Sequence, residues 1–253
     1  MSAVIFAGPS FPPSARPTVP GLEWRPPLCR GDLYLAALQR PRLIGVVDGY
    51  FETVPTVWHK EILWALAQGN HVYGAASIGA LRASELADFG MTGVGLVYRL
   101  FRSGTLIDDD EVAVLHGPAE LDYVPLTEAM VNVRSTVDGA LASGIVKPNV
   151  AAVLVSSAKS LFYKDRTFEL ILQRAAEGGL ASKELERFAD WLPRGKMDQK
   201  RLDAENMVSA ISRHMRTDAS PFEASFEFAH TFAWEEARQM IEQASGLTKA
   251  PSS

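Results

Sequence analysis

A serine between small residues is the first feature of this sequence that could do chemistry. Ser77 stands within residues 75–79, after a short apolar run and before a segment with helical apolar spacing. Small neighbours permit a sharp strand-to-helix turn that exposes a nucleophilic hydroxyl, and the free N–H groups of a helix start can hold a developing oxyanion. The alternative is that Ser77 only caps the helix, while its neighbours allow close packing on a sheet. The pattern alone favours the cap, and both interpretations stay open.

A histidine on the preceding predicted helix could act as the base for such a serine. His59 falls on the same apolar side of this helix as Trp58 and Ile62, where a histidine is more often a core residue than a catalyst. The helix nevertheless follows Asp48, which ends a predicted strand, so its first turn should lie near that end of the sheet. There, Asp48 or Glu61 could orient the ring of His59.

Two opposite charges lie within the apolar stripe of the helix after Ser77. Arg82 and Glu85 are three residues apart, and buried charges are costly unless they are paired. One interpretation is an ion pair on a partly exposed helix edge. The other is that Arg82 binds a carboxylate or thiocarboxylate of a substrate, with Glu85 beside it. Neither interpretation is favoured by the pattern.

The elements that must position these residues fall into two regions. Up to about residue 117, the sequence predicts strands at residues 4–6, 43–47 and 71–73, helices at 55–68 and 78–88, and a fourth strand at 112–115. This alternation predicts an α/β fold with a mainly parallel sheet flanked by helices. Helix-length segments follow at residues 128–142, 150–162, 168–177, 184–191, 202–215 and 222–243. We therefore expect an α/β domain over residues 1–117 and a helical domain or cap over 118–253.

The link between the first two predicted strands is rich in proline. Residues 9–27 hold seven prolines, and such a segment is not expected to form regular structure. An ordered surface loop is favoured over a docking or lid loop.

Strand ends bring the polar candidates together. Ligands of an open parallel sheet bind beyond the carboxyl ends of its strands, and Ser10, Asp48 and Ser77 each follow one predicted strand. An acidic run at residues 108–111, which includes Asp109, precedes the predicted fourth strand and would join this edge if that strand were antiparallel. The run is either a solvated turn or a site for Mg²⁺. The five histidines show no metal-ligand spacing, so no metal and no cofactor is assigned.

Composition limits the partners. The 253 residues carry a net charge of -5 without any block of Lys and Arg, so nucleic acid and anionic membrane are not expected partners. No apolar run approaches the roughly 20 residues of a membrane helix, and the chain does not open like a signal peptide. The single cysteine, Cys29, excludes an internal disulfide and a cysteine-cage zinc site. These features together predict a cytoplasmic protein.

Several ordered blocks resemble the TfuA-like family. They cover residues 46–52, 57–63, 74–86, 89–95 and 108–114. Residues 6–10 and 26–32 are also similar to the family, so the resemblance spans about residues 4–117. The resemblance implies partnership with a YcaO enzyme, which activates a backbone amide with ATP so that a sulfur nucleophile can give a thioamide. Thioamidated ribosomal peptide natural products and the thioglycine of methyl-coenzyme M reductase are products of such systems.

Two hypotheses of different class follow. In the first, the protein hydrolyses the C-terminal thiocarboxylate of a ThiS-like sulfur-carrier protein, with Ser77 as nucleophile, His59 as base and Asp48 orienting His59. The predicted substrate-binding residues are Arg82, Glu85, Ser10, Glu61 and Asp109. In the second, the protein is a non-catalytic recruiting or allosteric subunit of the YcaO enzyme, and the residues around Ser77 form an interface. The precursor peptide is a further candidate partner.

Overall fold

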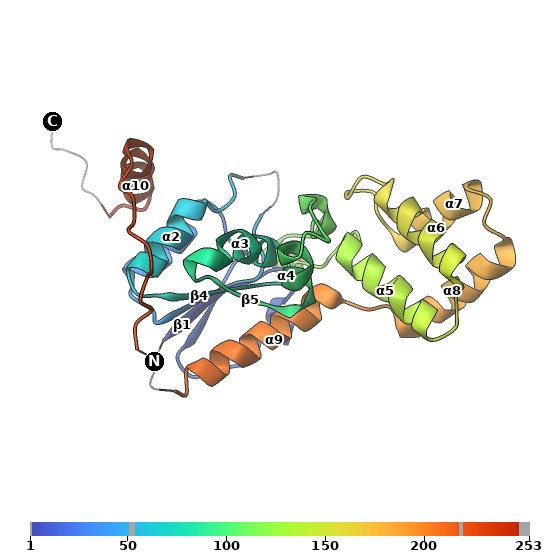
Figure 1. The fold of residues 1–253 in the computed structure, drawn as a ribbon, viewed down its shortest axis with the longest axis horizontal. Helices are drawn as coiled ribbons and strands as arrows, with labels where there is room; N and C mark the ends of the chain where they lie inside the picture. Colours follow the sequence, from blue (N-terminus) through green and yellow to red (C-terminus); the bar gives the residue numbers. More distant parts are fainter. Residues whose placement is uncertain (1, 51–53, 218–219, 248–253) are drawn as a thin grey trace.

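A single parallel sheet organises the N-terminal half of the computed structural model, which describes residues 2–50, 54–217 and 220–247 (Figure 1). Its strands are β1 (Ala3–Phe6), β2 (Leu22–Arg25), β3 (Leu43–Val46), β4 (His71–Ala75) and β5 (Thr92–Val94), in the spatial order β2-β1-β3-β4-β5. Every neighbouring pair is parallel. The predicted α/β class with a parallel sheet is confirmed.

Both faces of the sheet are buried, which explains why its strands read as continuous apolar runs. In β1, Val4 and Phe6 point to a core shared with α1 (Asp32–Leu38), α2 (His59–Ala67) and α3 (Ile78–Leu86). Ala3 and Ile5 point to the opposite core, which α9 (Gln199–His214) closes with Met207 and Ile211. Figure 1 shows α9 on the side of the sheet opposite α2 and α3.

The region after the sheet is helical, as predicted. It contains α5 (Met130–Ala142), α6 (Pro148–Lys159), α7 (Phe168–Glu177) and α8 (Ser182–Gly195), while α4 (Gly95–Arg102) packs between α3 and α9. Helices α5 to α8 enclose a core of their own, built around Val137, Leu154 and Phe188. The predicted division into two domains at residue 117 stays a prediction. Helix α9 lies beyond residue 117 in the sequence but packs against the sheet.

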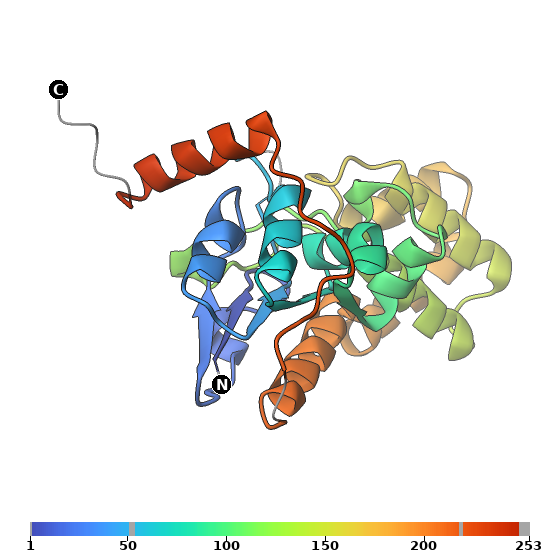
Figure 2. The ribbon, with the colours of Figure 1, turned by 60° about the vertical axis from the view of Figure 1, so that its left-hand side comes forward.

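The last helix is reached by an extended segment that crosses the outside of the α/β region (Figure 2). Trp234 of α10 (Phe232–Ala244) packs against both Tyr34 and Trp64, and its ring centroid lies 5.6 Å and 6.3 Å from theirs. The prediction of one helix over residues 222–243 is wrong in its first half. Phe222 and Phe226 have helical spacing, but they anchor extended chain to the core beside α2 instead of forming a helix face.

Three other predictions need correction. Residues 112–115, predicted as a strand, have an irregular backbone. The strand that follows β4 in the sequence is β5, at residues 92–94. The proline-rich segment contains β2, because residues 22–25 carry no proline and keep the N–H groups that a ladder needs. Helix α2 begins at His59 and not at residue 55, since the carboxylate of Glu61 accepts the Trp58 N–H and fixes the first turn there. Single turns of 3₁₀ helix occur at Pro13–Ala15, Ala87–Phe89, Asp109–Glu111 and Ala119–Leu121.

Helix α3 packs almost directly on the backbone of the sheet. A Cβ atom added to Gly79 would lie 1.8 Å from the carbonyl oxygen of Val46, and one added to Gly74 would lie 2.1 Å from the carbonyl oxygen of Gly79. The Gly79 N–H also donates to the Val47 carbonyl at 3.3 Å. This contact fixes the first turn of α3, and therefore Ser77, at the carboxyl ends of β3 and β4.

The Gly79→Ala variant tests this contact. Backbone atoms cannot rotate away as a side chain can, so we expect a loss of about 1–3 kcal/mol in the free energy of unfolding. Gly178→Ala is the control, because its Cβ would meet its nearest atoms at 3.4 Å and 3.5 Å, and a change within about 0.5 kcal/mol is expected. Urea unfolding measures both. Equal stability of the two variants would contradict the close approach of α3.

Candidate active site

A cavity of about 930 Å³ opens at the carboxyl ends of β1, β3 and β4. The sheet supplies Asp48, the start of α3 supplies Ser77, and α9 supplies Lys200. Residues 107–109 and 112–118 form one wall, and the loop after α6 forms part of another. Of the predicted site residues, Asp48, Ser77, Arg82, Glu85 and Asp109 line this cavity.

The turn before Ser77 is strained. Ala76 has φ 66°, although it is not glycine, and the Ser77 N–H donates to the Ala75 carbonyl two residues back at 2.8 Å. This is a γ-turn of the rarer type with positive φ, and such a conformation costs about 1–3 kcal/mol. Strain of this kind persists where the surrounding structure enforces it, and it is concentrated at functional sites.

The Ser77 side chain does not cap α3. The Ser77 carbonyl accepts the N–H groups of Ala80 and Leu81, but its hydroxyl accepts no N–H of the first turn. Instead, Ser77 lines the cavity while only 8% exposed. Among the described residues the Ile78 N–H has no backbone acceptor. The N–H that follows an exposed serine is where an oxyanion hole uses a donor.

Asp48 and Ser10 come together as expected. Asp48 is 1% exposed, and its carboxylate accepts the N–H groups of Gly8 and Ser10, both at 2.9 Å, and the Ser10 hydroxyl at 2.6 Å. These bonds tie the end of β1 to the end of β3. Ser10 therefore supports Asp48 and is itself only 3% exposed.

Lys200, which the sequence pattern did not single out, is a buried basic side chain that lines this cavity and is 3% exposed. Its Nζ donates to the Val112 carbonyl at 2.7 Å and lies 3.9 Å from Asp48 Oδ1. Burial lowers the pKa of Lys200, although the charges of Asp48 and Asp198 act in the opposite direction. Helical spacing could have found this residue, because Lys200 precedes Ala204, a core residue of α9, by four positions.

His59 is held by a different carboxylate from the expected ones. Its Nε2 lies 2.8 Å from Glu85 Oε2, and the same oxygen accepts a hydrogen bond from Arg82 at 2.7 Å. The structure does not bring Asp48 to His59, because helix α2 begins at His59 and turns its ring toward α3. Arg82 and Glu85, predicted as either an ion pair or a substrate site, form the pair and also line the cavity.

Glu61 is also placed away from His59. Its carboxylate accepts the N–H groups of Gly31 at 2.9 Å and Trp58 at 3.1 Å, and it is fully buried. Burial raises the pKa of Glu61, while these backbone donors act to lower it. The side chain thus fixes the starts of α1 and α2 and does not face the cavity.

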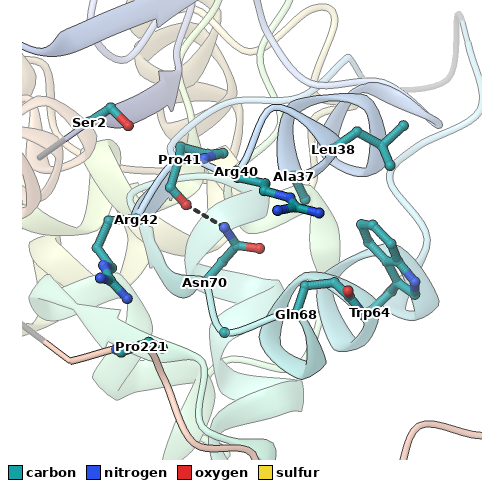
Figure 3. Close-up of a pocket in the computed structure, with 11 residues that line it drawn as sticks. Ser2, Ala37, Leu38, Arg40, Pro41, Arg42, Trp64, Gln68, Asn70 and Pro221 are labelled. Atoms are coloured by element: carbon teal, nitrogen blue, oxygen red, sulfur yellow. Dashed lines mark hydrogen bonds between the residues drawn. The ribbon is translucent and has the colours of Figure 1, made fainter.

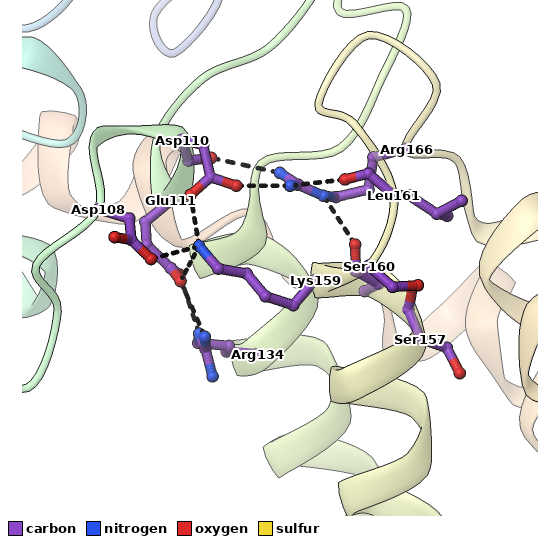
Figure 4. A network of polar contacts seen from close by, with 10 residues as sticks. Asp108, Asp110, Glu111, Arg134, Ser157, Lys159, Ser160, Leu161 and Arg166 are labelled. Carbon is purple, nitrogen blue, oxygen red and sulfur yellow. Dashed lines mark hydrogen bonds and ion pairs between the residues drawn. The ribbon is translucent and has the colours of Figure 1, made fainter.

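The acidic run holds a lysine ammonium group (Figure 4). Lys159 Nζ lies 3.0 Å from both Asp108 Oδ2 and Glu111 Oε1 and also contacts Asp110. Arg166 binds Asp110 at 2.8 Å, and Arg134 binds both oxygens of Glu111 at 2.8 Å and 2.9 Å. Although the oxygens of Asp108, Asp110 and Glu111 lie within 4.8 Å of one another, a cation already occupies their centre. The run therefore joins the sheet region to α5 and α6.

A second cavity, of about 760 Å³, lies at the opposite edge of the sheet (Figure 3). Trp64, Asn70, Arg40 and Arg42 line it, and the Asn70 amide donates to the Pro41 carbonyl. None of the predicted site residues lines this cavity. The Ser77 cavity therefore remains the candidate active site.

The lowered pKa of Lys200 can be tested by measuring protein stability as a function of pH. Because folding lowers this pKa, the unfolded chain binds more protons between the folded value and the ordinary lysine value, so stability rises with pH in that range. The free energy of unfolding of the wild type, minus that of Lys200→Met, should therefore increase as the pH is raised toward the ordinary lysine pKa of about 10.5, as measured by urea unfolding. A flat or falling difference would show that burial does not penalise the ammonium.

Most of the residues that line this cavity lie in a segment that matches one family of proteins. No curated protein matches the chain. Over the described residues, no helix has both the length and the apolar composition for crossing a bilayer. A sequence model described as TfuA-like protein matches residues 48–167, which run from Asp48 through Ser77 to Arg166 and Thr167. The TfuA-like family is associated with YcaO-dependent thioamidation. The resemblance to the TfuA-like family is thereby confirmed over residues 48–117 of the expected range 4–117. The match does not include residues 4–47, and it continues beyond residue 117 into α5 and α6.

Proposed function

We propose that this protein hydrolyses the C-terminal thiocarboxylate of a ThiS-like sulfur-carrier protein and so delivers sulfide to a YcaO partner. The observation that carries the proposal is the strained turn at Ala76, which presents Ser77 to a cavity that also contains the buried Lys200. A serine and a lysine are a known alternative to the serine and histidine of hydrolases.

Lys200 is a better base for Ser77 than His59. A general base must be unprotonated, and burial favours the neutral amine of Lys200. His59, in contrast, is bound to Glu85 and does not line the cavity. Asp48, which was expected to orient His59, instead lies 3.9 Å from Lys200 and helps to position its amine.

The first half of the reaction forms an ester on Ser77. The hydroxyl oxygen of Ser77 attacks the thioacyl carbon as its proton passes to the amine of Lys200, and the Ile78 N–H stabilises the oxyanion of the adduct. The C–S bond then breaks. The sulfur takes the proton from Lys200 and leaves as hydrosulfide.

The second half restores the enzyme. A water molecule attacks the ester carbon and gives its proton to Lys200, and the Ser77 oxygen departs with that proton. The carboxylic acid that forms loses its remaining proton to solvent. The products are the carrier carboxylate, hydrosulfide and one proton, so one water is consumed for each sulfur released. No oxidant or reductant is required.

A non-catalytic role as a recruiting or allosteric subunit is the second candidate. Apolar side chains are exposed on the loops that surround the cavity, including Ile107, which is 82% exposed, Leu121 and Leu126. Exposed apolar groups gathered in this way are typical of protein interfaces. A carrier protein, a YcaO enzyme or a precursor peptide could each bind to such an interface. A recruiting subunit would not release sulfide on its own, whereas a hydrolase would.

Substitution of Ser77 separates the two functions. We expect Ser77→Ala to lower sulfide release from a thiocarboxylated carrier by about a thousandfold or more, because the nucleophile is lost while the fold persists. Lys200→Arg should cause a similar loss, since arginine stays protonated. Sulfide is measured directly with the purified protein.

Ser84→Ala is the matched control, because Ser84 lies on the same helix and its hydroxyl only donates to the Leu81 carbonyl at 2.7 Å. It should keep the wild-type rate. Full activity of Ser77→Ala would rule out the proposed mechanism and leave the recruiting role.

A further inference from the structure

One carboxylate oxygen at the cavity is shared by two donors from different helices. Glu85 Oε2 accepts from Arg82 at 2.7 Å and lies 2.8 Å from His59 Nε2. Burial would raise the pKa of Glu85, but the bonds from His59 and Arg82 outweigh it and hold that pKa below its usual value. Glu85 is therefore a charged carboxylate on the wall of the candidate active-site cavity, with its side chain 37% exposed.

Arg82 has fewer hydrogen-bond acceptors among the described residues than its guanidinium group has donors. It is 9% exposed and lines the cavity, and Glu85 is its one hydrogen-bond partner among the described residues. Its Nε is buried and has no acceptor in the described part of the chain. A buried donor without a partner is costly, so an incoming acceptor would relieve that cost.

We propose that Glu85 is an internal stand-in for the terminal carboxylate or thiocarboxylate of the substrate, and that His59 holds Glu85 when the substrate displaces it from Arg82. The choice of a terminal thiocarboxylate rests on the proposed function. The exchange of one carboxylate for another at Arg82 does not depend on turnover.

The shared oxygen makes the exchange possible. If Glu85 had Arg82 as its single partner, a substrate would have to leave a partly buried carboxylate unpaired, which is unfavourable. His59 offers a second donor that remains in place. Two other basic side chains of α2 and α4 have partners of their own, because Lys60 donates to the Ala229 carbonyl and Arg102 pairs with Asp88.

His59 is in this view a positioning residue. It acts through Glu85 on Arg82 and does not touch the reacting carbon. The arrangement also gives selectivity, because a neutral terminal amide offers no charge to replace that of Glu85. Arg82 should therefore admit acidic chain ends and disfavour neutral ones.

Binding without turnover tests the exchange. In a Ser77→Ala background, calorimetry compares two forms of one short peptide, ending in a free carboxylate or in a neutral amide. We expect tighter binding of the carboxylate form, and we expect both Arg82→Gln and the more conservative Arg82→Lys to reduce that difference.

The partners of Arg82 are then changed in the same background. His59→Ala should weaken carboxylate binding by about two- to fivefold, and Glu85→Gln should strengthen it by a similar factor, as for a partly exposed ion pair. The double variant should bind like Glu85→Gln alone, because His59 has no role once the competing charge is gone. Glu177→Gln, which breaks the pair with Arg174 at the same spacing on α7, should change nothing.

The outcomes are distinct. Equal binding of the carboxylate and amide peptides to the Ser77→Ala protein would overturn the inference and leave the hydrolysis intact. Weakening by His59→Ala in the Glu85→Gln background would also overturn it. A wild-type protein that discriminates between the peptides but releases no sulfide would instead refute the proposed function alone.

Discussion

The buried carboxylate of Asp48 fixes the geometry on which the rest of the site depends. A charged oxygen this far from water is tolerated only when donors surround it, and it finds them on the loop after β1 through Gly8 and Ser10. In addition, Lys200 Nζ lies 3.9 Å from Asp48 Oδ1. Three segments from distant parts of the chain are thus held in one arrangement.

This arrangement supports the proposed role of Lys200 as the base in place of His59. Lys200 stays close to a carboxylate, yet its pKa is lowered because the loss of water outweighs the attraction of Asp48. A fully solvated lysine beside the same carboxylate would remain charged and could not accept a proton. In the proposed mechanism it is therefore the dry environment, and not the residue type alone, that allows Lys200 to act as a base.

The sequence was sufficient to predict the positions of residues that follow directly from local patterns and from the ends of strands. Ser10, Asp48 and Ser77 gather at one edge because parallel strands all end there, and this follows from the strand pattern alone. Lys200 was missed because it lies more than a hundred positions from Ser77, with the helical region between them. Glu85, the partner of His59, was not predicted because the direction of the His59 side chain depends on where α2 begins. The hydrogen bond from the Trp58 N–H to Glu61 moves that start by about one turn from the predicted position. Strand β2 was hidden by the prolines that flank it.

The helical region influences the site through the same lysine. The chain leaves the sheet after α4, builds α5 to α8, and returns as α9, whose first turn carries Lys200. Asn132 of α5 accepts the Lys200 N–H at 3.1 Å and donates to Asp198 at 3.0 Å, so α5 sets the position of that turn. Lys159 binds the acidic run from the same side and keeps α6 against the cavity. In the proposed mechanism the nucleophile therefore comes from the start of α3 beside the sheet, while the base is positioned by α5 and α9, and neither region alone contains both residues.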